Sequence, residues 1–209
     1  MKAAVLLSGG IDSPVSAYIV AKKLGKKLQE MIFINFQVSD DKGDKIGKLV
    51  RRIKELTGIR TKLYKIPYEM IQRMFIEKCM TCLTCILCKR FMFRIAEKIA
   101  KNENADLLVT GENLSQVASQ TLDNMVVNTN AIKMRIIRPI LCNDKEETIA
   151  IAKETGLFEL SILPGIKCSA VPQNPATKST VQQLEHEESK IDVNEIVSNA
   201  LNAAVQIEY

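Results

Sequence analysis

Short apolar runs alternate with segments of helical periodicity along most of the chain. The apolar runs predict strands at 3–8, 31–36, 62–66, 106–110 and 134–138. The segments in which apolar residues recur every three or four positions predict helices at 13–25, 45–57, 68–78, 89–103, 114–127 and 145–155. Continuous apolar strands between amphipathic helices are typical of a parallel sheet with both faces covered. We therefore predict an α/β fold built on a doubly wound parallel sheet, whose ligands bind at the carboxyl ends of the strands.

The pattern changes after the last of these helices. Residues 163–180 are rich in proline and polar side chains and predict a loop, and residues 181–207 predict one or two helices. We therefore expect a main domain at 1–178 and an acidic helical C-terminal extension at 179–209. The chain carries a net charge of +5, but the extension holds six acidic residues and one basic residue, so that the main domain carries +10. A basic domain suits nucleic-acid binding, although a solvated lysine-rich surface would give the same balance.

Composition narrows the class of protein further. The 209 residues are 46% hydrophobic and 25% charged, as in an ordinary globular protein, and no run of 18 apolar residues predicts a membrane span. The apolar run at the N-terminus leads directly into a glycine turn, so we expect no signal peptide and a cytoplasmic protein. In that reducing compartment, clustered cysteines are expected to be metal ligands or reactive thiols and not disulfides.

The sequence LLSGGIDSP joins the first predicted strand to the first predicted helix. Gly9 and Gly10 allow the backbone to bend sharply and to approach a ligand closely. The amides from Gly9 to Ser13 would then point at an anion at the start of the helix, with the Ser8 and Ser13 hydroxyls as further donors. Asp12 would repel a bare phosphate, so its presence indicates a bound Mg²⁺. The stretch is neither a Walker loop nor a GxGxxG fingerprint.

With SGGIDS after a first strand, the chain resembles the PP-loop, or N-type, ATP pyrophosphatases, which activate a carbonyl oxygen with AMP and release pyrophosphate. Four further stretches resemble the ThiI-type tRNA 4-thiouridine synthases: CKRFMFRIAEKIA, LLVTGENLSQVASQTLDNM, IIRPILCNDKEETIAIAKETG and KCSAVPQNPAT. The resemblance covers about residues 1–178 and implies a Rossmann-like, adenine nucleotide alpha hydrolase-like fold. The chain departs from the family in beginning at the PP-loop without a THUMP region, in lacking a rhodanese-type domain, and in having FINFQVSDD where the family has His-Phe and prolines.

The resemblance implies an ATP site and a catalytic set. The implied ATP-binding residues are Leu6, Leu7, Ser8, Gly9, Gly10, Asp12, Ser13, Phe33, Ile34, Lys89, Gly111 and Gln120. In the family, the backbone at the end of the second strand contacts the adenine edge, which here corresponds to Phe33 and Ile34. The implied catalytic residues are Asp12, Lys145 and Cys168, of which Lys145 would stabilise charge that builds on the phosphate. Without the resemblance, Lys145 would be interpreted as a surface lysine at a helix start.

Four cysteines recur at every third residue: Cys79, Cys82, Cys85 and Cys88. On one continuous helix, successive cysteines would drift by about 60°, so all four thiols could meet at one metal only if the helix bends. A subset of archaeal-type members of the family pairs a CxxC with a distant cysteine and binds a [4Fe–4S] cluster, which implies Cys85, Cys88 and Cys168 as its ligands. A Zn²⁺ site and a metal-free persulfide at Cys168 are the alternatives.

The other candidate residues are expected to have lesser roles. Cys79 and Cys82 would be alternative ligands or thiols through which sulfur enters the site. Cys142 is expected to be a buried small hydrophobe, and His186 an exposed residue. Four arginines are candidates for holding an RNA backbone: Arg51, Arg52, Arg90 and Arg94.

The resemblance thus implies an ATP-dependent sulfurtransferase for 4-thiouridine synthesis. It would adenylate a uridine carbonyl in tRNA, release pyrophosphate, and replace the oxygen with sulfur as AMP leaves. The expected partners are tRNA or another RNA, bound directly or through a separate RNA-binding protein, and sulfide or another sulfur donor. Two alternatives stay open: a PP-loop ligase with a nitrogen nucleophile, and a subunit that supplies sulfur to a partner chain. A homodimer is compatible with the sequence, which does not fix the oligomeric state.

Overall fold

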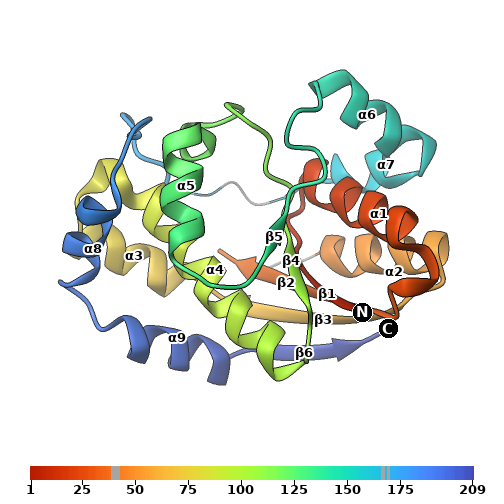
Figure 1. The fold of residues 1–209 in the computed structure, drawn as a ribbon, viewed down its shortest axis with the longest axis horizontal. Coiled ribbons are helices and arrows are strands. Elements are labelled where there is room, and N and C mark those ends of the chain that lie inside the picture. Colours follow the sequence, from red (N-terminus) through yellow and green to blue (C-terminus); the bar gives the residue numbers. More distant parts are fainter. Residues whose placement is uncertain (39–42, 166–167, 169) are drawn as a thin grey trace.

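The computed structural model describes residues 1–38, 43–165, 168 and 170–209, in which a six-stranded sheet lies between two layers of helices (Figure 1). The strand order is β5-β4-β1-β2-β3-β6. The strands are β1 (Lys2–Leu6), β2 (Glu30–Gln37), β3 (Arg60–Pro67), β4 (Leu107–Val109), β5 (Ile136–Ile137) and β6 (Val205–Glu208). Strands β1 to β5 pair in parallel, whereas β6 pairs antiparallel with β3. The predicted α/β fold on a parallel sheet is confirmed.

The helices of the described residues connect the strands and flank the sheet. They are α1 (Asp12–Leu24), α2 (Lys45–Thr57), α3 (Glu69–Lys78), α4 (Thr84–Asn102), α5 (Leu122–Asn130), α6 (Lys145–Glu154), α7 (Leu157–Ser161), α8 (Val181–Glu188) and α9 (Val193–Asn202). Three short 3₁₀ turns are η1 (Gly25–Lys27), η2 (Thr81–Leu83) and η3 (Ala118–Gln120). Within the described ranges, none of these helices is both long and apolar enough to cross a membrane.

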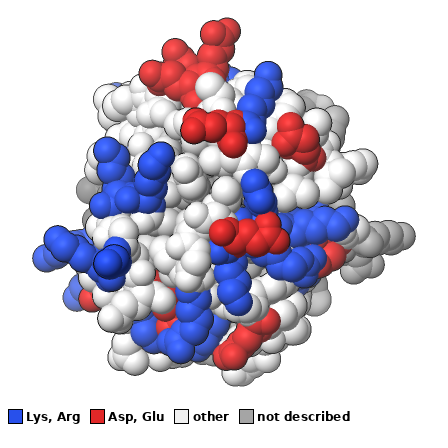
Figure 2. Space-filling model, turned by 90° about the vertical axis from the view of Figure 1, so that its right-hand side faces the viewer, with Lys and Arg blue, Asp and Glu red and all other residues white. Residues whose placement is uncertain are grey.

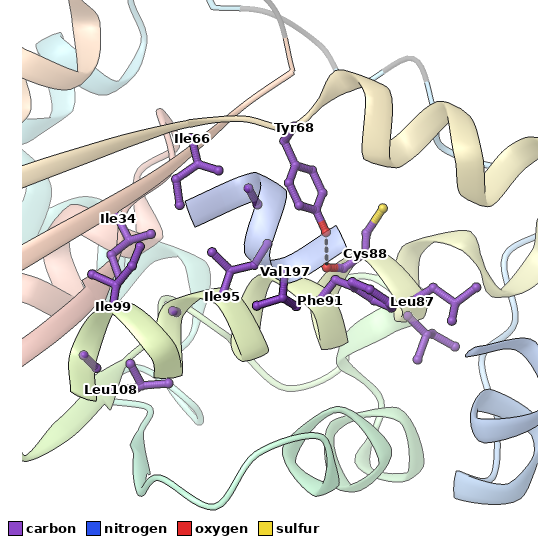
Figure 3. Packing of buried hydrophobic residues seen from close by; sticks show 14 of the residues in the cluster. Ile34, Ile66, Tyr68, Leu87, Cys88, Phe91, Ile95, Ile99, Leu108 and Val197 are labelled. Atoms are coloured by element: carbon purple, nitrogen blue, oxygen red, sulfur yellow. Dashed lines mark hydrogen bonds between the residues drawn. The ribbon is translucent and has the colours of Figure 1, made fainter. Parts of the chain in front are cut away.

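Alternate residues of the central strands pack against opposite helical layers. In β1, Ala4 belongs to the apolar cluster that contains α4, whereas Val5 belongs to the cluster that contains α1 and α2. In β2, Ile34 belongs to the cluster that contains α4, and Phe33 belongs to the cluster that contains α1 and α2. Figure 3 shows Ile34 together with Ile95 of α4 in the first of these clusters. This alternation explains why the central strands are apolar throughout, since a sheet covered on both faces has no solvent-facing side.

Two helix starts differ from the predicted positions by more than one residue. Helix α4 begins at Thr84, five residues before the predicted start at 89. Helix α5 begins at Leu122, so the prediction of a helix from 114 was wrong. Ser115 has a left-handed φ of 60°, which a helix does not accept, and the Thr121 side chain caps α5 by accepting from the amide of Asn124. Residues 114–121 therefore form a loop with a defined conformation, which includes η3, at the carboxyl end of the sheet.

The C-terminal segment packs onto the main sheet and its helices. Leu184 of α8 and Val197 of α9 are buried in the cluster that contains α4. Residues 205–208 form β6, with Lys62 opposite Glu208 and Lys65 opposite Val205, so the prediction of helix up to residue 207 was wrong there. The alternation of apolar and polar residues in VQIE is that of an edge strand, and β3 supplies its hydrogen bonds. The domain boundary at 178 stays a prediction.

Candidate functional site

The turn between β1 and α1 is closed by its two serines. Ser13 Oγ accepts from the Ser8 amide at 2.8 Å and lies 2.9 Å from Ser8 Oγ. The Gly10 amide donates to Ser8 Oγ at 3.3 Å. A Cβ on Gly111 would lie 2.6 Å from the Ser13 nitrogen, so only glycine allows the loop after β4 to approach the start of α1 this closely. The structure thus brings Gly111, Ser8, Gly10 and Ser13 together at the carboxyl end of the sheet.

Asp12 meets two residues that are far away in the sequence. Its Oδ1 lies 3.2 Å from Lys145 Nζ, and its Oδ2 accepts from Gln116 Nε2 at 3.1 Å. Lys145 begins α6, whose start is fixed by a capping box between Asp144 and Glu147. The Lys145 and Asp12 side chains are 51% and 24% exposed, so their attraction is screened by water and easily exchanged for a ligand. Gln116 is not among the predicted site residues, although it lies inside TGENLSQVASQTL.

Lys89 and Gln120 have protein partners at this end of the sheet. Lys89 Nζ lies 3.0 Å from Oε1 of the buried Glu112, and Arg138 Nε lies 2.7 Å from Oε2 of the same carboxylate. Burial alone would raise the pKa of Glu112, but the charges of Lys89 and Arg138 outweigh it and hold this pKa below its usual value. Gln120 Oε1 accepts from the Asn113 amide at 3.1 Å and so shapes the loop that follows β4.

Phe33 and Ile34 lie inside β2 and not at its end, since the strand continues to Gln37. The Ile34 carbonyl accepts from the Leu7 amide at 2.9 Å, so it is already used in hydrogen bonding between neighbouring chain segments of the sheet. The Gln37 carbonyl accepts from Tyr68 on the other side, as the alternation of main-chain groups along a strand requires. Phe36 therefore turns its main-chain groups to the β1 side, beyond the last β1–β2 pair at Leu6 and Ile34.

Three of the six cysteines lie close together. Cys85 and Cys88 occupy the first turns of α4, and the Cys168 sulfur accepts from Gln72 Nε2 at 3.3 Å. Burial raises the pKa of Cys85, and the charge of Cys168 raises it further. Burial also raises the pKa of Cys88, with further contributions from Cys85 and Cys168. Negative charge on the neighbouring sulfurs thus disfavours ionisation of Cys85 and Cys88, and a bound cation would relieve this repulsion.

The chemistry of this thiol set suits a soft metal centre. Three sulfur donors from two segments are the ligand type that iron–sulfur clusters and Zn²⁺ prefer. In the part of the chain that the structure describes, no three Cys, His, Asp or Glu side chains already stand in metal-ligating geometry. Cys85, Cys88 and Cys168 therefore fit a cluster by donor type and proximity, and ligation would require their side chains to move together.

The remaining cysteines and His186 lie apart from this thiol set. Cys79 ends α3 and its Sγ donates to the Glu187 carbonyl at 3.7 Å, while the Cys82 carbonyl accepts from the Ala176 amide. The cysteine stretch is thus not one continuous helix. Cys142 is exposed, so its predicted burial was wrong, because β5 ends at Ile137 and Cys142 lies in the turn before α6. His186 is exposed, as predicted.

The four candidate arginines all have protein partners. The Arg90 side chain is only 1% exposed and binds Glu188, which also binds Arg94. The prediction that Arg90 contacts RNA was therefore wrong. Arg51 pairs with Asp44 at 2.8 Å, and Arg52 donates to the Thr155 carbonyl at 2.9 Å. Figure 2 shows Lys and Arg side chains in several separate groups on one face, with acidic side chains between them.

Comparisons with known proteins agree on one family. The model described as "Thiamine biosynthesis protein (ThiI)" matches residues 1–193. A "Probable tRNA sulfurtransferase" of Finegoldia magna is 35% identical over 201 residues, which are 95% of this chain and 51% of the relative. One from Alkaliphilus oremlandii is 37% identical over 205 residues, 97% of this chain and 52% of the relative. The chain thus spans about half the length of the curated relatives it matches.

One solved structure supports the same assignment, and a second shares the fold. A crystal structure of a 4-thiouridine synthetase–RNA complex with bound ATP matches with a TM-score of 0.91 and 33% identity, over 99% of this chain and 55% of that chain. The U34-tRNA thiolase NcsA from Methanococcus maripaludis, solved with its [4Fe–4S] cluster, matches with a TM-score of 0.54 and 19% identity, over 97% of this chain and 73% of that one. The second match shows the fold alone.

Proposed function

Since this chain belongs to the ThiI family, we propose that it is an ATP-dependent tRNA sulfurtransferase that makes 4-thiouridine. The observation that carries the proposal is the meeting of Asp12, Gln116 and Lys145 beside the glycine turn. These residues come from three separate segments, and two of them were assigned catalytic roles from the sequence. A carboxylate, an ammonium and an amide at the start of a helix suit a magnesium-bound triphosphate.

In the first step, ATP is held by the turn that follows β1. The amides of Gly9 to Ser13 at the start of α1 bind phosphate oxygens, and Asp12 holds Mg²⁺ directly or through water. The oxygen at uridine C4 attacks the α-phosphorus and pyrophosphate leaves, so the base becomes adenylated. Lys145 stabilises the charge that builds on the phosphate. We propose that the Phe36 main chain contacts the adenine edge, in place of Phe33 and Ile34.

In the second step, sulfur replaces the activated oxygen. A sulfide equivalent adds to C4, the C–O bond breaks, and AMP leaves with the oxygen. We propose that Cys85, Cys88 and Cys168 hold a [4Fe–4S] cluster, which when bound supplies a site that presents sulfide. Gln72 keeps the Cys168 side chain near α4 through its hydrogen bond to the sulfur. The donor set equally suits Zn²⁺, and metal analysis of the purified protein separates the two.

We further propose that the RNA substrate binds to this chain directly or through a separate protein, that sulfide or another sulfur donor supplies the sulfur, and that the protein acts in the cytoplasm. Arg90 is unavailable for the RNA because it is buried against Glu188. The RNA contacts must come from the exposed lysines and arginines, which on the face in Figure 2 form separate groups. The homodimer stays a prediction.

One anaerobic assay tests both steps. Purified protein is mixed with tRNA, Mg²⁺, sulfide and ATP, and then AMP, pyrophosphate and thiolated uridine are measured. We expect Lys145→Ala to reduce pyrophosphate release at least about 100-fold, the scale for loss of a group that stabilises transition-state charge. The matched control is Lys153→Ala on the same helix, which should keep nearly full activity. Absence of AMP and of thiolated RNA with the reconstituted wild-type protein would rule out the sulfurtransferase.

A further inference from the structure

Two adjacent carboxylates of α8 bind residues at the start of the cysteine segment, which we define as Cys79–Cys88, and just beyond its end. Glu187 Oε2 accepts from the Met80 amide at 2.8 Å, and the Glu187 carbonyl accepts from Cys79 Sγ at 3.7 Å. Glu188 binds Arg90, which lies two residues beyond Cys88. The start of the cysteine segment and the residue two positions beyond its end are therefore bound by one turn of one helix.

Both carboxylates are buried and fully engaged. The Glu187 side chain is 3% exposed, and its Oε1 lies 2.6 Å from Lys190 Nζ. Glu188 accepts from Arg90 Nε at 2.7 Å and Nη2 at 3.1 Å, and from Arg94 Nη1 at 2.6 Å and Nη2 at 2.8 Å. Arg90 also donates from Nη1 to the Val127 carbonyl of α5. Such bidentate pairs fix direction as well as distance.

A third contact holds the middle of the cysteine segment. The Cys82 carbonyl accepts from the Ala176 amide at 2.9 Å. The Ala176 carbonyl in turn accepts from Asn124 Nδ2 at 2.9 Å, and Asn124 Oδ1 accepts from Ser179 Oγ at 2.6 Å. The stretch from Ala176 to Glu188 thus lies along the cysteine segment and is tied to it at three points.

We propose that Glu187 and Glu188 are positioning residues that set where the Cys85 and Cys88 thiols point. The inference rests on the proposed function, in which those thiols act together with Cys168. Glu187 and Glu188 are consecutive, so their Cα atoms are held about 3.8 Å apart. They therefore hold Met80 and Arg90, which flank η2 and the start of α4, against neighbouring positions of α8. The two carboxylates themselves touch no reacting atom.

The test compares Glu187→Ala with Glu185→Ala, an exposed position on the same helix. Anaerobic titration with Co²⁺ alone reports thiolate ligation through its charge-transfer band, and Cys88→Ala shows whether the band comes from this thiol set. We expect Glu187→Ala to weaken Co²⁺ binding at least 10-fold, and Glu185→Ala and Glu187→Gln to stay within about 3-fold of the wild type. A glutamine at position 187 can still accept from the Met80 amide. Co²⁺ affinity that is retained in Glu187→Gln would therefore show that the hydrogen bond, and not the negative charge, is what matters at this position. Affinities are measured well below the melting temperature of each variant.

The outcomes separate this inference from the proposed function. Wild-type affinity in Glu187→Ala, with the band lost in Cys88→Ala, would overturn the positioning role and leave the thiol site standing. If the wild type itself shows no thiolate band, the metal site fails, and the positioning role is judged from iodoacetamide labelling of each cysteine. Labelling of Cys85 and Cys88 at least 5-fold faster in Glu187→Ala than in Glu185→Ala supports it, and equal rates overturn it.

Discussion

Replacing Glu188 with alanine should destabilise the whole protein strongly. The mutation leaves the Arg90 guanidinium 1% exposed and without its carboxylate, and it also removes the partner of Arg94. Breaking one side of a buried ion pair costs about 3–5 kcal/mol, far more than the roughly 0–1 kcal/mol of an exposed pair. For a chain of 209 residues, that corresponds to a fall in melting temperature on the order of 10 °C.

Urea unfolding followed by circular dichroism measures this cost, with the midpoint shift converted through the slope. The control is Glu185→Ala, which removes an exposed carboxylate from the same helix and should change the unfolding free energy by less than about 0.5 kcal/mol. A loss below about 1 kcal/mol for Glu188→Ala would mean that Arg90 reaches water or another partner. The burial assigned to this pair would then be wrong.

Three further predictions concern the glycine turn and the buried carboxylates. Gly111→Ala should weaken ATP binding, measured by calorimetry, at least 10-fold, because the new Cβ would lie 2.6 Å from the Ser13 nitrogen. The control is Gly43→Ala, whose Cβ would have nothing within 4 Å and which should leave ATP affinity unchanged. Asp12→Asn should abolish Mg²⁺-dependent pyrophosphate release yet shift the unfolding free energy by less than about 1 kcal/mol, since its ion pair is exposed. Burial raises the pKa of Glu188 and of Glu112, but their cationic partners outweigh it and hold both pKa values below the usual 4.5. The stability that these carboxylates contribute is therefore present above pH 4.5 and is lost as the pH falls below it. A melting temperature that shows no such loss in an acid titration would contradict this prediction.

The fold and the glycine turn could be predicted because they depend on local patterns. Apolar runs gave the central strands, and SGGIDS marked the turn before α1 directly. The partners of the site residues could not be predicted, since each contact joins distant segments. Gln116 reaches Asp12 only because the loop after β4 bends at Ser115. Likewise, Ile34 pairs with Leu6 inside the sheet, and not at the end of β2, because β2 runs past the end of β1, which depends on strand register and not on composition.

The C-terminal segment shows why the net charge counted from a sequence can misrepresent the charge on the protein surface. Residues 179–209 carry −5 and looked like an acidic extension beside a basic domain. Glu187 and Glu188, however, are buried against Lys190, Arg90 and Arg94, so both carboxylates are used inside the fold. The same contacts bury Arg90, whose side chain is 1% exposed, and pair Arg94, which stays 20% exposed, with Glu188. The positive charge available to bind RNA phosphates is therefore smaller than the net charge of +10 implies. The slope of RNA affinity against salt concentration should then correspond to fewer phosphate contacts than a count of basic residues would suggest.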